Sequence, residues 1–377
     1  MLFFKPKSHL GIDLGAGGIK IVELKLEKKR PVLYTYGLTS QMQDVHHLFD
    51  VSAKNNTSAL SADQKSKSTA VTIDPEQVKK YANLLKAVCT GSRTTALSAT
   101  VSLPVSVVFH AVINLPLLKK EELDRVLRAE VKKLLPRPID DMVLDYQMIK
   151  NAPESKTQRV LVNAVPKELV VFYTQVFKLA GIGLESLEPE SIALERSLIG
   201  RDQSVAMIID IGAERTNFYI IDQGFAITHN STEIGGGRLN KILAGVLGIK
   251  EDIVEQLKCD YFGSLLKKNN HSQMTKDKFY SLFSTIIDPI VKEIEYSFEI
   301  YLKQTGNENK RPEKIILTGG GSSMPYLADF ISEKFNIKCY VGDPWGRVVY
   351  QEGLKPALGK IGPRMSVAVG LALRKLV

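Results

Sequence analysis

Two aspartates that end apolar runs are the residues of this chain best placed to do chemistry. Asp13 stands near the end of the apolar run Leu10–Leu14 and begins the phrase Asp-Leu-Gly-Ala, and Asp210 stands near the end of the run Val205–Ile211 and begins Asp-Ile-Gly-Ala. A carboxylate at the end of a buried strand is costly unless something pairs with it. Two carboxylates in matching contexts predict a duplicated lobe, and we expect the two copies to hold a nucleotide and its metal ion.

The residues after each aspartate are of types that bind phosphate. Glycines between two strands let backbone N–H groups approach an anion, because no Cβ intervenes. The residues expected at the first turn, after Asp13, are Gly15, Ala16, Gly17, Gly18 and Lys20. Those expected at the second turn, after Asp210, are Gly212, Thr216 and Asn217. Mg²⁺ usually takes one or two carboxylates plus phosphate oxygens and water, so Asp13 and Asp210 are the expected metal ligands. A plain hairpin would also use glycine, so either turn alone leaves both interpretations open.

Two further glycine runs lie in the second half of the chain. Gly319, Gly320, Gly321 and Ser322 stand between an apolar strand and a helix, where backbone can lie against a base or a phosphate. Gly235, Gly236 and Gly237 open a helical section. Glu255 and Lys258 follow there at helical spacing, which by itself indicates a surface ion pair.

The hydrophobic patterns that must position these residues repeat once along the chain. Each half begins with three strands, expected at 10–14, 19–26 and 32–36, and again at 205–211, 217–221 and 225–229. A strand–helix–strand unit, with strands at 99–114 and 142–149, looks inserted into the first lobe. Later helices are expected at 75–89, 167–180, 189–199, 239–247, 284–302, 325–335 and 364–376, and later strands at 160–165, 184–187 and 314–318.

These patterns predict an α/β protein of two similar lobes, each with an insertion. The expected boundaries are a first-lobe core at 1–97 with a flexible polar loop at 52–69, the inserted subdomain at 98–158, and the first lobe continued at 159–200. The second lobe follows as a core at 201–237, a helical subdomain at 238–310, and a core with a C-terminal joining helix at 311–377.

Composition favours a cytoplasmic globular protein. Of the 377 residues, 44% are hydrophobic and 24% charged, and the three cysteines, Cys89, Cys259 and Cys339, lie far apart without a CxxC pair. No apolar run approaches the roughly 18 to 20 residues of a membrane span, and the first residues lack the apolar core of a signal peptide. The net charge of +9 is spread along the chain, so we expect no nucleic-acid partner.

The four glycine-rich elements, in this order, resemble the actin-like ATPase superfamily. The resemblance implies an actin-like fold of two RNase H-like lobes that close on ATP and Mg²⁺. It assigns Asp13 to Lys20 and Asp210 to Thr216 to the two phosphate turns, Glu255 and Lys258 to the ribose, and Gly319 to Ser322 to the adenosine. It also implies two crossing helices between the lobes, at 189–199 and 364–376, with Ala193, Ala368 and Gly370 small enough for close packing.

Longer phrases are similar to the PilM family of type IV pilus assembly proteins. They include Gly-Ile-Asp-Leu-Gly and Lys-Ile-Val-Glu-Leu near the N-terminus, Leu-Pro at 135–136, Val-Leu-Asp-Tyr at 143–146, Asp-Ile-Gly-Ala-Glu-Arg-Thr at 210–216, and Gly-Leu-Ala-Leu-Arg at 370–374. The resemblance implies the inserted subdomain shared by PilM and the cell-division protein FtsA. It implies an ATP-binding assembly protein, peripheral to the inner membrane through its partners, that grips the N-terminal cytoplasmic tail of a PilN-like protein. Contacts with other pilus platform or motor components are also implied, and homo-oligomer formation stays open.

Two alternatives belong to the same superfamily. An FtsA-like filament protein would usually end in an amphipathic membrane helix, whereas this chain ends directly after the expected joining helix. A small-molecule kinase would need a base in the cleft, for which Glu188 and Glu190 are candidates. Relatives usually carry Ser or Thr in the first turn, where this chain has Ala16, Gly17 and Gly18. We therefore expect ATP binding with weak or no hydrolysis and assign no catalytic residue.

Overall fold

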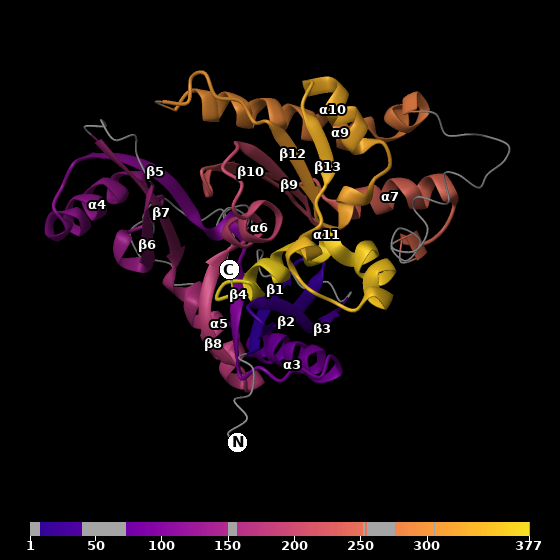
Figure 1. Ribbon diagram of the computed structural model, residues 1–377, viewed down its shortest axis with the longest axis horizontal. Helices are drawn as coiled ribbons and strands as arrows, with labels where there is room; N and C mark the ends of the chain where they lie inside the picture. Colours follow the sequence, from indigo (N-terminus) through magenta and orange to yellow (C-terminus); the bar gives the residue numbers. More distant parts are fainter. Residues whose placement is uncertain are drawn as a thin grey trace, which may run out of the picture.

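The computed structural model describes residues 8–39, 73–149, 157–251, 253–254, 276–304 and 306–376. Within these ranges the strands form two five-stranded sheets and one three-stranded sheet. The two larger sheets belong to two stacked lobes, and the small sheet lies to one side of them (Figure 1).

The first sheet has strand order β3-β2-β1-β4-β8. Its strands are β1 (Ser8–Gly15), β2 (Gly18–Glu27), β3 (Arg30–Leu38), β4 (Ser98–Leu103) and β8 (Gly183–Pro189). One face packs on α3 (Pro75–Gly91) and α5 (Lys167–Ala180), whose apolar positions recur at helical spacing. Gly181 ends α5 in the left-handed conformation, as is typical of a helix C-terminus.

The second sheet repeats this topology as β11-β10-β9-β12-β13. Its strands are β9 (Ala206–Ile211), β10 (Thr216–Asp222), β11 (Phe225–Thr232), β12 (Lys314–Thr318) and β13 (Lys338–Val341). The helices α7 (Gly236–Leu247), α9 (Lys276–Leu302) and α10 (Leu327–Phe335) cover one face. Equal strand order in two sheets confirms the duplicated lobe that the paired aspartates predicted.

Two helices lie between the lobes. They are α6 (Glu190–Leu194), which continues as a π-helical turn at Glu195–Ile199, and α11 (Lys355–Ala372). A Cβ on Gly370 of α11 would lie 1.9 Å from the carbonyl oxygen of Ala193, so only glycine lets the two backbones cross this closely. The crossing expected from small residues is thereby confirmed, and α11 runs between the two sheets in Figure 1.

The inserted subdomain differs from the expected boundaries. The run expected as one strand at 99–114 breaks after Leu103, so β4 belongs to the first sheet and β5 (Phe109–Pro116) begins the small sheet. The run at 160–165, expected in the first lobe, lies in β7 (Thr157–Pro166), the central strand of the small sheet. An apolar run shows that a strand is buried but not which sheet it joins, and this explains both differences.

The small sheet has order β5-β7-β6, with β6 at Met142–Ile149. The amphipathic helix α4 (Lys120–Leu134) covers one face through Leu123, Leu127 and Val131. Ile149 and Leu161 belong to a cluster with Ile220 and Ile227 of the second lobe. The insertion therefore branches from the first lobe and packs on the second.

Other expected helix limits also differ. Helix α11 begins at Lys355 and runs through Pro363, although a start at Arg364 was expected. Helix α9 begins at Lys276, ahead of the expected 284, and α10 begins at Leu327 after a short 3₁₀ turn at Gly320–Ser323. The edge strand β13 was not expected, because it is only four residues long and mostly exposed, so it carries little hydrophobic pattern.

The loop expected at 52–69, together with Glu255 and Lys258, lies outside the described residues. No helix in the described ranges has the length and apolar character needed to cross a bilayer.

Candidate functional site

A cleft of about 1020 Å³ opens between the two lobes, and the glycine-rich turns line it. Ligand pockets commonly measure roughly 300–1,000 Å³, so this cleft is large enough for a nucleoside triphosphate. The expected site residues that line it are Asp13, Gly15, Ala16, Gly17, Lys20, Asp210, Gly212, Asn217, Gly235, Gly236, Gly237, Gly319, Gly320 and Gly321. Residues more than three hundred positions apart in the sequence, such as Asp13 and Gly321, are therefore brought to one place.

The two aspartates occupy equivalent positions, at the carboxyl ends of the central strands β1 and β9. Asp13 pairs in register with Lys20 on β2, and Asp210 pairs with Asn217 on β10. A two-strand hairpin places its turn directly beyond each pair, at the mouth of the cleft. A Cβ on Gly17 would lie 3.2 Å from that of Ala213, so the tips of the two turns nearly touch.

Asp13 is buried and held by two partners. Its Oδ2 lies 3.0 Å from Lys20 Nζ, and its Oδ1 accepts a hydrogen bond of 2.9 Å from the Ser102 hydroxyl. Ser102 lies at the end of β4, where no sequence pattern singled it out. The ion pair and hydrogen bond offset the cost of burying the carboxylate.

Asp210 has neither kind of partner among the described residues. Burial, and next the nearby charge of Asp13, raise its pKa to about 6, although Lys20 acts in the opposite direction. A Cβ on Gly319, whose φ is +81°, would lie 2.3 Å from Asp210 Oδ1. The turn after β12 thus needs glycine to pass this close to the second carboxylate.

Glu190, at the start of α6, lines the cleft together with the two aspartates. Burial, followed by Asp13 and Asp210, raises its pKa well above the usual range, and its Oε2 has no hydrogen-bond partner among the described residues. Those residues contain no group of three or more His, Cys, Asp or Glu arranged to chelate a metal. Mg²⁺ bound through one or two carboxylates and water requires no such group, so Asp13 and Asp210 fit this type of site.

The glycines at 235–237 build the wall of the cleft. The N–H groups of Gly236 and Gly237 donate to the carbonyls of Gly212 and Ala213 at 2.8 and 2.7 Å. The Thr216 hydroxyl, which is fully buried, donates to the carbonyl of Ile234. These bonds fasten the start of α7 to the second turn.

Gly18, Thr216 and Ser322 do not line the cleft. The Ser322 hydroxyl donates to the Gly319 carbonyl at 2.7 Å and so closes the third turn on itself. Gly320 is exposed, and a Cβ there would have no neighbour nearer than 3.7 Å, in the side chain of Arg364. Of the third turn, Gly320 is the residue that best leaves room for a ligand.

Sequence reasoning missed four basic residues that line the cleft. They are Arg215, Arg238, Lys241 and Arg364. Arg215 also forms an ion pair of 3.5 Å with Glu233. A phosphate chain needs such positive charge, but single arginines and lysines carry no motif that separates them from surface residues.

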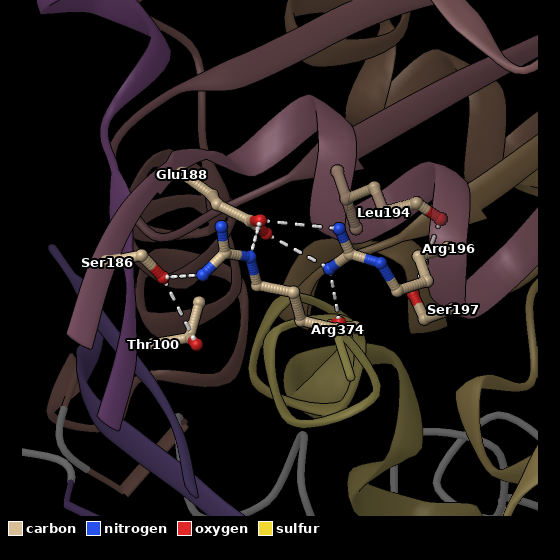
Figure 2. Close-up of polar contacts among 8 residues, drawn as sticks. Thr100, Ser186, Glu188, Leu194, Arg196, Ser197 and Arg374 are labelled. Atoms are coloured by element: carbon tan, nitrogen blue, oxygen red, sulfur yellow. Dashed lines mark hydrogen bonds and ion pairs between the residues drawn. The ribbon is translucent and has the colours of Figure 1, made fainter. Parts of the chain in front are cut away.

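Glu188 lies away from the cleft in an ion-pair network. Arg196 donates to Glu188 at 3.0 Å and to the Gly370 carbonyl at 2.7 Å, and Arg374 approaches Glu188 to 2.6 Å. Figure 2 shows both guanidinium groups converging on this carboxylate, with Ser186 and Thr100 beside them. The network ties the end of β8 to both crossing helices. Of the two candidate bases, Glu190 alone faces the cleft.

Known proteins are similar to this chain over most of its length. A family model described as type IV pilus assembly protein PilM matches residues 59–376. The structure of a PilM–PilN type IV pilus biogenesis complex aligns with a TM-score of 0.74 and 20% identity, covering 99% of this chain and 100% of that chain. The ethanolamine utilization protein EutJ from Carboxydothermus hydrogenoformans aligns with a TM-score of 0.52 and 14% identity, covering 98% and 91%. These structural similarities show an actin-like fold.

Cell-division proteins FtsA are similar over a shorter part. The FtsA of Borreliella burgdorferi is 24% identical over 209 residues, which is 52% of this chain and 49% of that protein. The FtsA of Enterococcus faecalis is 26% identical over 198 residues, or 48% and 44% of the two chains. The match spans about half the length of these relatives.

Proposed function

Because the chain belongs to the PilM family of type IV pilus assembly proteins, we propose that it is an ATP-binding component of the inner-membrane assembly platform. Its role lies in pilus assembly. The observation that supports nucleotide binding is the convergence of three glycine-rich turns, from two duplicated sheets, on one cleft that contains Asp13 and Asp210.

The cleft suits Mg–ATP in its residues as well as its size. Asp13 and Asp210 would hold Mg²⁺ directly or through water, and the bound ion would neutralise phosphate charge. Lys20, Arg215 and Arg238 line the same cleft and would meet the phosphates. Gly320 and Arg364 lie where the adenosine would bind if the third turn serves the role that the resemblance gives it.

We propose that the protein binds ATP but does not hydrolyse it efficiently. The first turn carries Ala16 and Gly17 at the cleft, so it offers backbone N–H groups but no hydroxyl. Glu188, one candidate base, is occupied by two arginines. Bound ATP would then act by setting how far the lobes close, which is a shift between conformations.

The partner proposed for this platform protein is the N-terminal cytoplasmic tail of a PilN-like membrane protein. The aligned structure is a PilM–PilN complex, and the chain that aligns is matched over its full length. Localisation would follow from this partner, which would keep the protein peripheral to the inner membrane.

Thermal unfolding with and without Mg–ATP tests the nucleotide site. A ligand at 100 times its Kd stabilises the folded state by about 2.7 kcal/mol, so Tm should rise by several degrees. Gly320→Leu should abolish this rise without lowering the basal Tm, because a side chain there enters the cleft and meets no backbone. Asp210→Ala should abolish it as well.

Gly359→Leu is the matched control, since a Cβ at Gly359 has no neighbour within 4 Å and the residue lies outside the cleft lining. This variant should keep the full response to Mg–ATP. A wild-type Tm that does not change at millimolar Mg–ATP would refute nucleotide binding.

A further inference from the structure

The first sheet has a second exposed end, opposite the cleft, which carries cations and leucines. Strand β1 begins there at Ser8 and reaches the cleft at its other end, where Asp13 and Gly15 line it. We call this the basal end and define it by Lys25 to Arg30, Arg93, Leu97, Lys178 and Leu179. Strand pairing brings the hairpin and Leu97 together, because Ser8 lies opposite Lys25, and Leu10 lies opposite Ala99, two residues after Leu97. The Gly183 N–H donates to the Leu97 carbonyl, so the end of α5 with Lys178 and Leu179 lies near them.

The β2–β3 hairpin forms the most basic part of the basal end. Glu27 pairs with Arg30, so Lys28 and Lys29 form a two-residue turn with φ values of 47° and 63°. Such turns favour Asn and Gly, because positive φ is unfavourable for other residues. Two lysines hold this conformation here, and Lys28, Lys29 and Arg30 are all exposed. Strain of this kind suggests that the charges have a use.

The cations at the basal end exceed the acids. Lys25, Lys28, Lys29, Arg30, Arg93 and Lys178 have no ion pair with any residue that the structure describes, although Lys25 lies 3.1 Å from the centroid of the Tyr34 ring. Glu27 is the exposed acid within the hairpin. Glu23 is buried and accepts from Thr95, and Glu185 pairs with Lys375, so neither offsets the cations.

Exposed leucines stand among these charges. Leu97 is 89% exposed, Leu179 is 56% exposed and Leu26 is 39% exposed. The Leu97 carbonyl accepts from the Gly183 N–H at 2.8 Å, which places Leu97 beside the chain leaving α5. Each leucine stands on a different connection, so they do not form one continuous groove for a peptide.

We infer that the basal end contacts the surface of an anionic phospholipid bilayer. Lysines and arginines are attracted to the anionic headgroups, while the single exposed leucines and the Tyr34 ring beside Lys25 enter the interface. Separate leucines among cations fit a fluid surface better than the fixed apolar pocket of a protein partner.

Co-sedimentation with lipid vesicles tests the inference on the full chain. The protein should bind vesicles that contain phosphatidylglycerol and not vesicles of phosphatidylcholine alone, and binding should weaken as salt is raised. The triple variant Lys28→Gln, Lys29→Gln, Arg30→Gln should bind roughly 100-fold more weakly, since each cation near the surface contributes a several-fold factor. Leu97→Gln should also weaken vesicle binding. Because the Leu97 side chain is exposed, this substitution should leave the fold intact, so weaker binding would not result from misfolding.

The matched control removes three charges elsewhere, with Arg125→Gln, Lys132→Gln and Lys133→Gln on the exposed face of α4. It should bind vesicles like the wild type. All variants should keep their thermal response to Mg–ATP, because the cleft lies at the other end of the sheet, and this checks that they are folded. The inference fails if anionic vesicles are not bound at low salt, or if the control weakens binding as much as the hairpin variant. Binding only to an acidic protein would also overturn it.

Discussion

At the scale of single residues, the two duplicated aspartates have different surroundings. Asp13 faces Lys20 across the hairpin, whereas Asp210 faces Asn217, so a cation in one lobe corresponds to an amide in the other. The ion pair and the Ser102 hydroxyl hold Asp13, and the raised pKa of Asp210 reflects the absence of comparable support. The second carboxylate is therefore the one whose charge most needs a bound cation.

Asp210→Asn should stabilise the ligand-free protein at neutral pH. Burial and the charge of Asp13 raise the pKa of Asp210 from its ordinary value of 3.8 to about 6 in the folded state. Its contribution is therefore fully present below pH 4 and is lost as pH rises through 6, when this half-buried group ionises at a cost of at most about 3 kcal/mol. The neutral asparagine avoids this cost, so Tm at pH 7.5 should exceed that of the wild type, while the increase with Mg–ATP should shrink.

Melting curves between pH 4 and pH 8 measure this effect. The difference between variant and wild type should vanish near pH 4. Asp140→Asn, in an exposed turn, serves as the control and should leave the pH profile unchanged. A variant less stable than the wild type at pH 7.5 would contradict the prediction.

At the scale of elements, the inserted sheet meets the second lobe through a pair of histidines. His110 on β5 and His229 on β11 have ring centroids 5.0 Å apart. His110 Nε2 lies 2.7 Å from the Ala226 carbonyl oxygen, and Nδ1 lies 2.9 Å from the amide group of Asn163. Burial lowers the pKa of both rings, and the neighbouring His110 lowers that of His229 further, to about 3. Both histidines of this junction are therefore neutral at pH 7.

Acid should loosen this junction before the lobe cores. Folded pKa values below the ordinary 6.5 mean that stability is present above pH 6.5 and is lost as pH falls, because the unfolded chain takes up the protons first. At pH 5 the loss for His229 is about 2 kcal/mol. His229→Gln should therefore lessen the fall in Tm between pH 7.5 and pH 5. Hydrogen exchange should show β5 and β11 opening first in the wild type, and equal acid sensitivity of the variant would disprove the role of the ring.

At the scale of the whole molecule, two lobes meet where α6 and α11 cross. The backbones touch at Ala193 and Gly370, and Arg196 and Arg374 join both helices to Glu188 of the first sheet. The two glycine-rich turns, at Gly17 and Ala213, form a second contact between the lobes, across the cleft. Closure on a nucleotide would thus move the first-lobe sheet relative to the second lobe, on which the inserted sheet packs.

Nucleotide and partner binding should be linked through this closure. A peptide of the PilN-like N-terminal tail should bind with a Kd that changes at least about fivefold when Mg–ATP is added, because both ligands would favour one lobe arrangement. Isothermal titration in both orders should give the same factor. Gly320→Leu should keep peptide binding but lose the effect of Mg–ATP. Identical peptide affinity with and without nucleotide would rule out the linkage.

The sequence alone determined the duplication and most of the candidate cleft. Repeated strand patterns, Asp13 and Asp210 at strand ends, and glycines at turns are local signals, because hydrophobic period and backbone freedom act within a few residues. The tertiary structure decided what depends on distant contacts. It decided that β4 belongs to the first sheet and β7 to the small sheet, and that Ser102 donates a hydrogen bond to Asp13. It also decided that Glu188 pairs with two arginines outside the cleft, and that Lys28, Leu97 and Leu179 lie at one end of the first lobe. These features depend on which surfaces pack together, and no short stretch of chain carries that information.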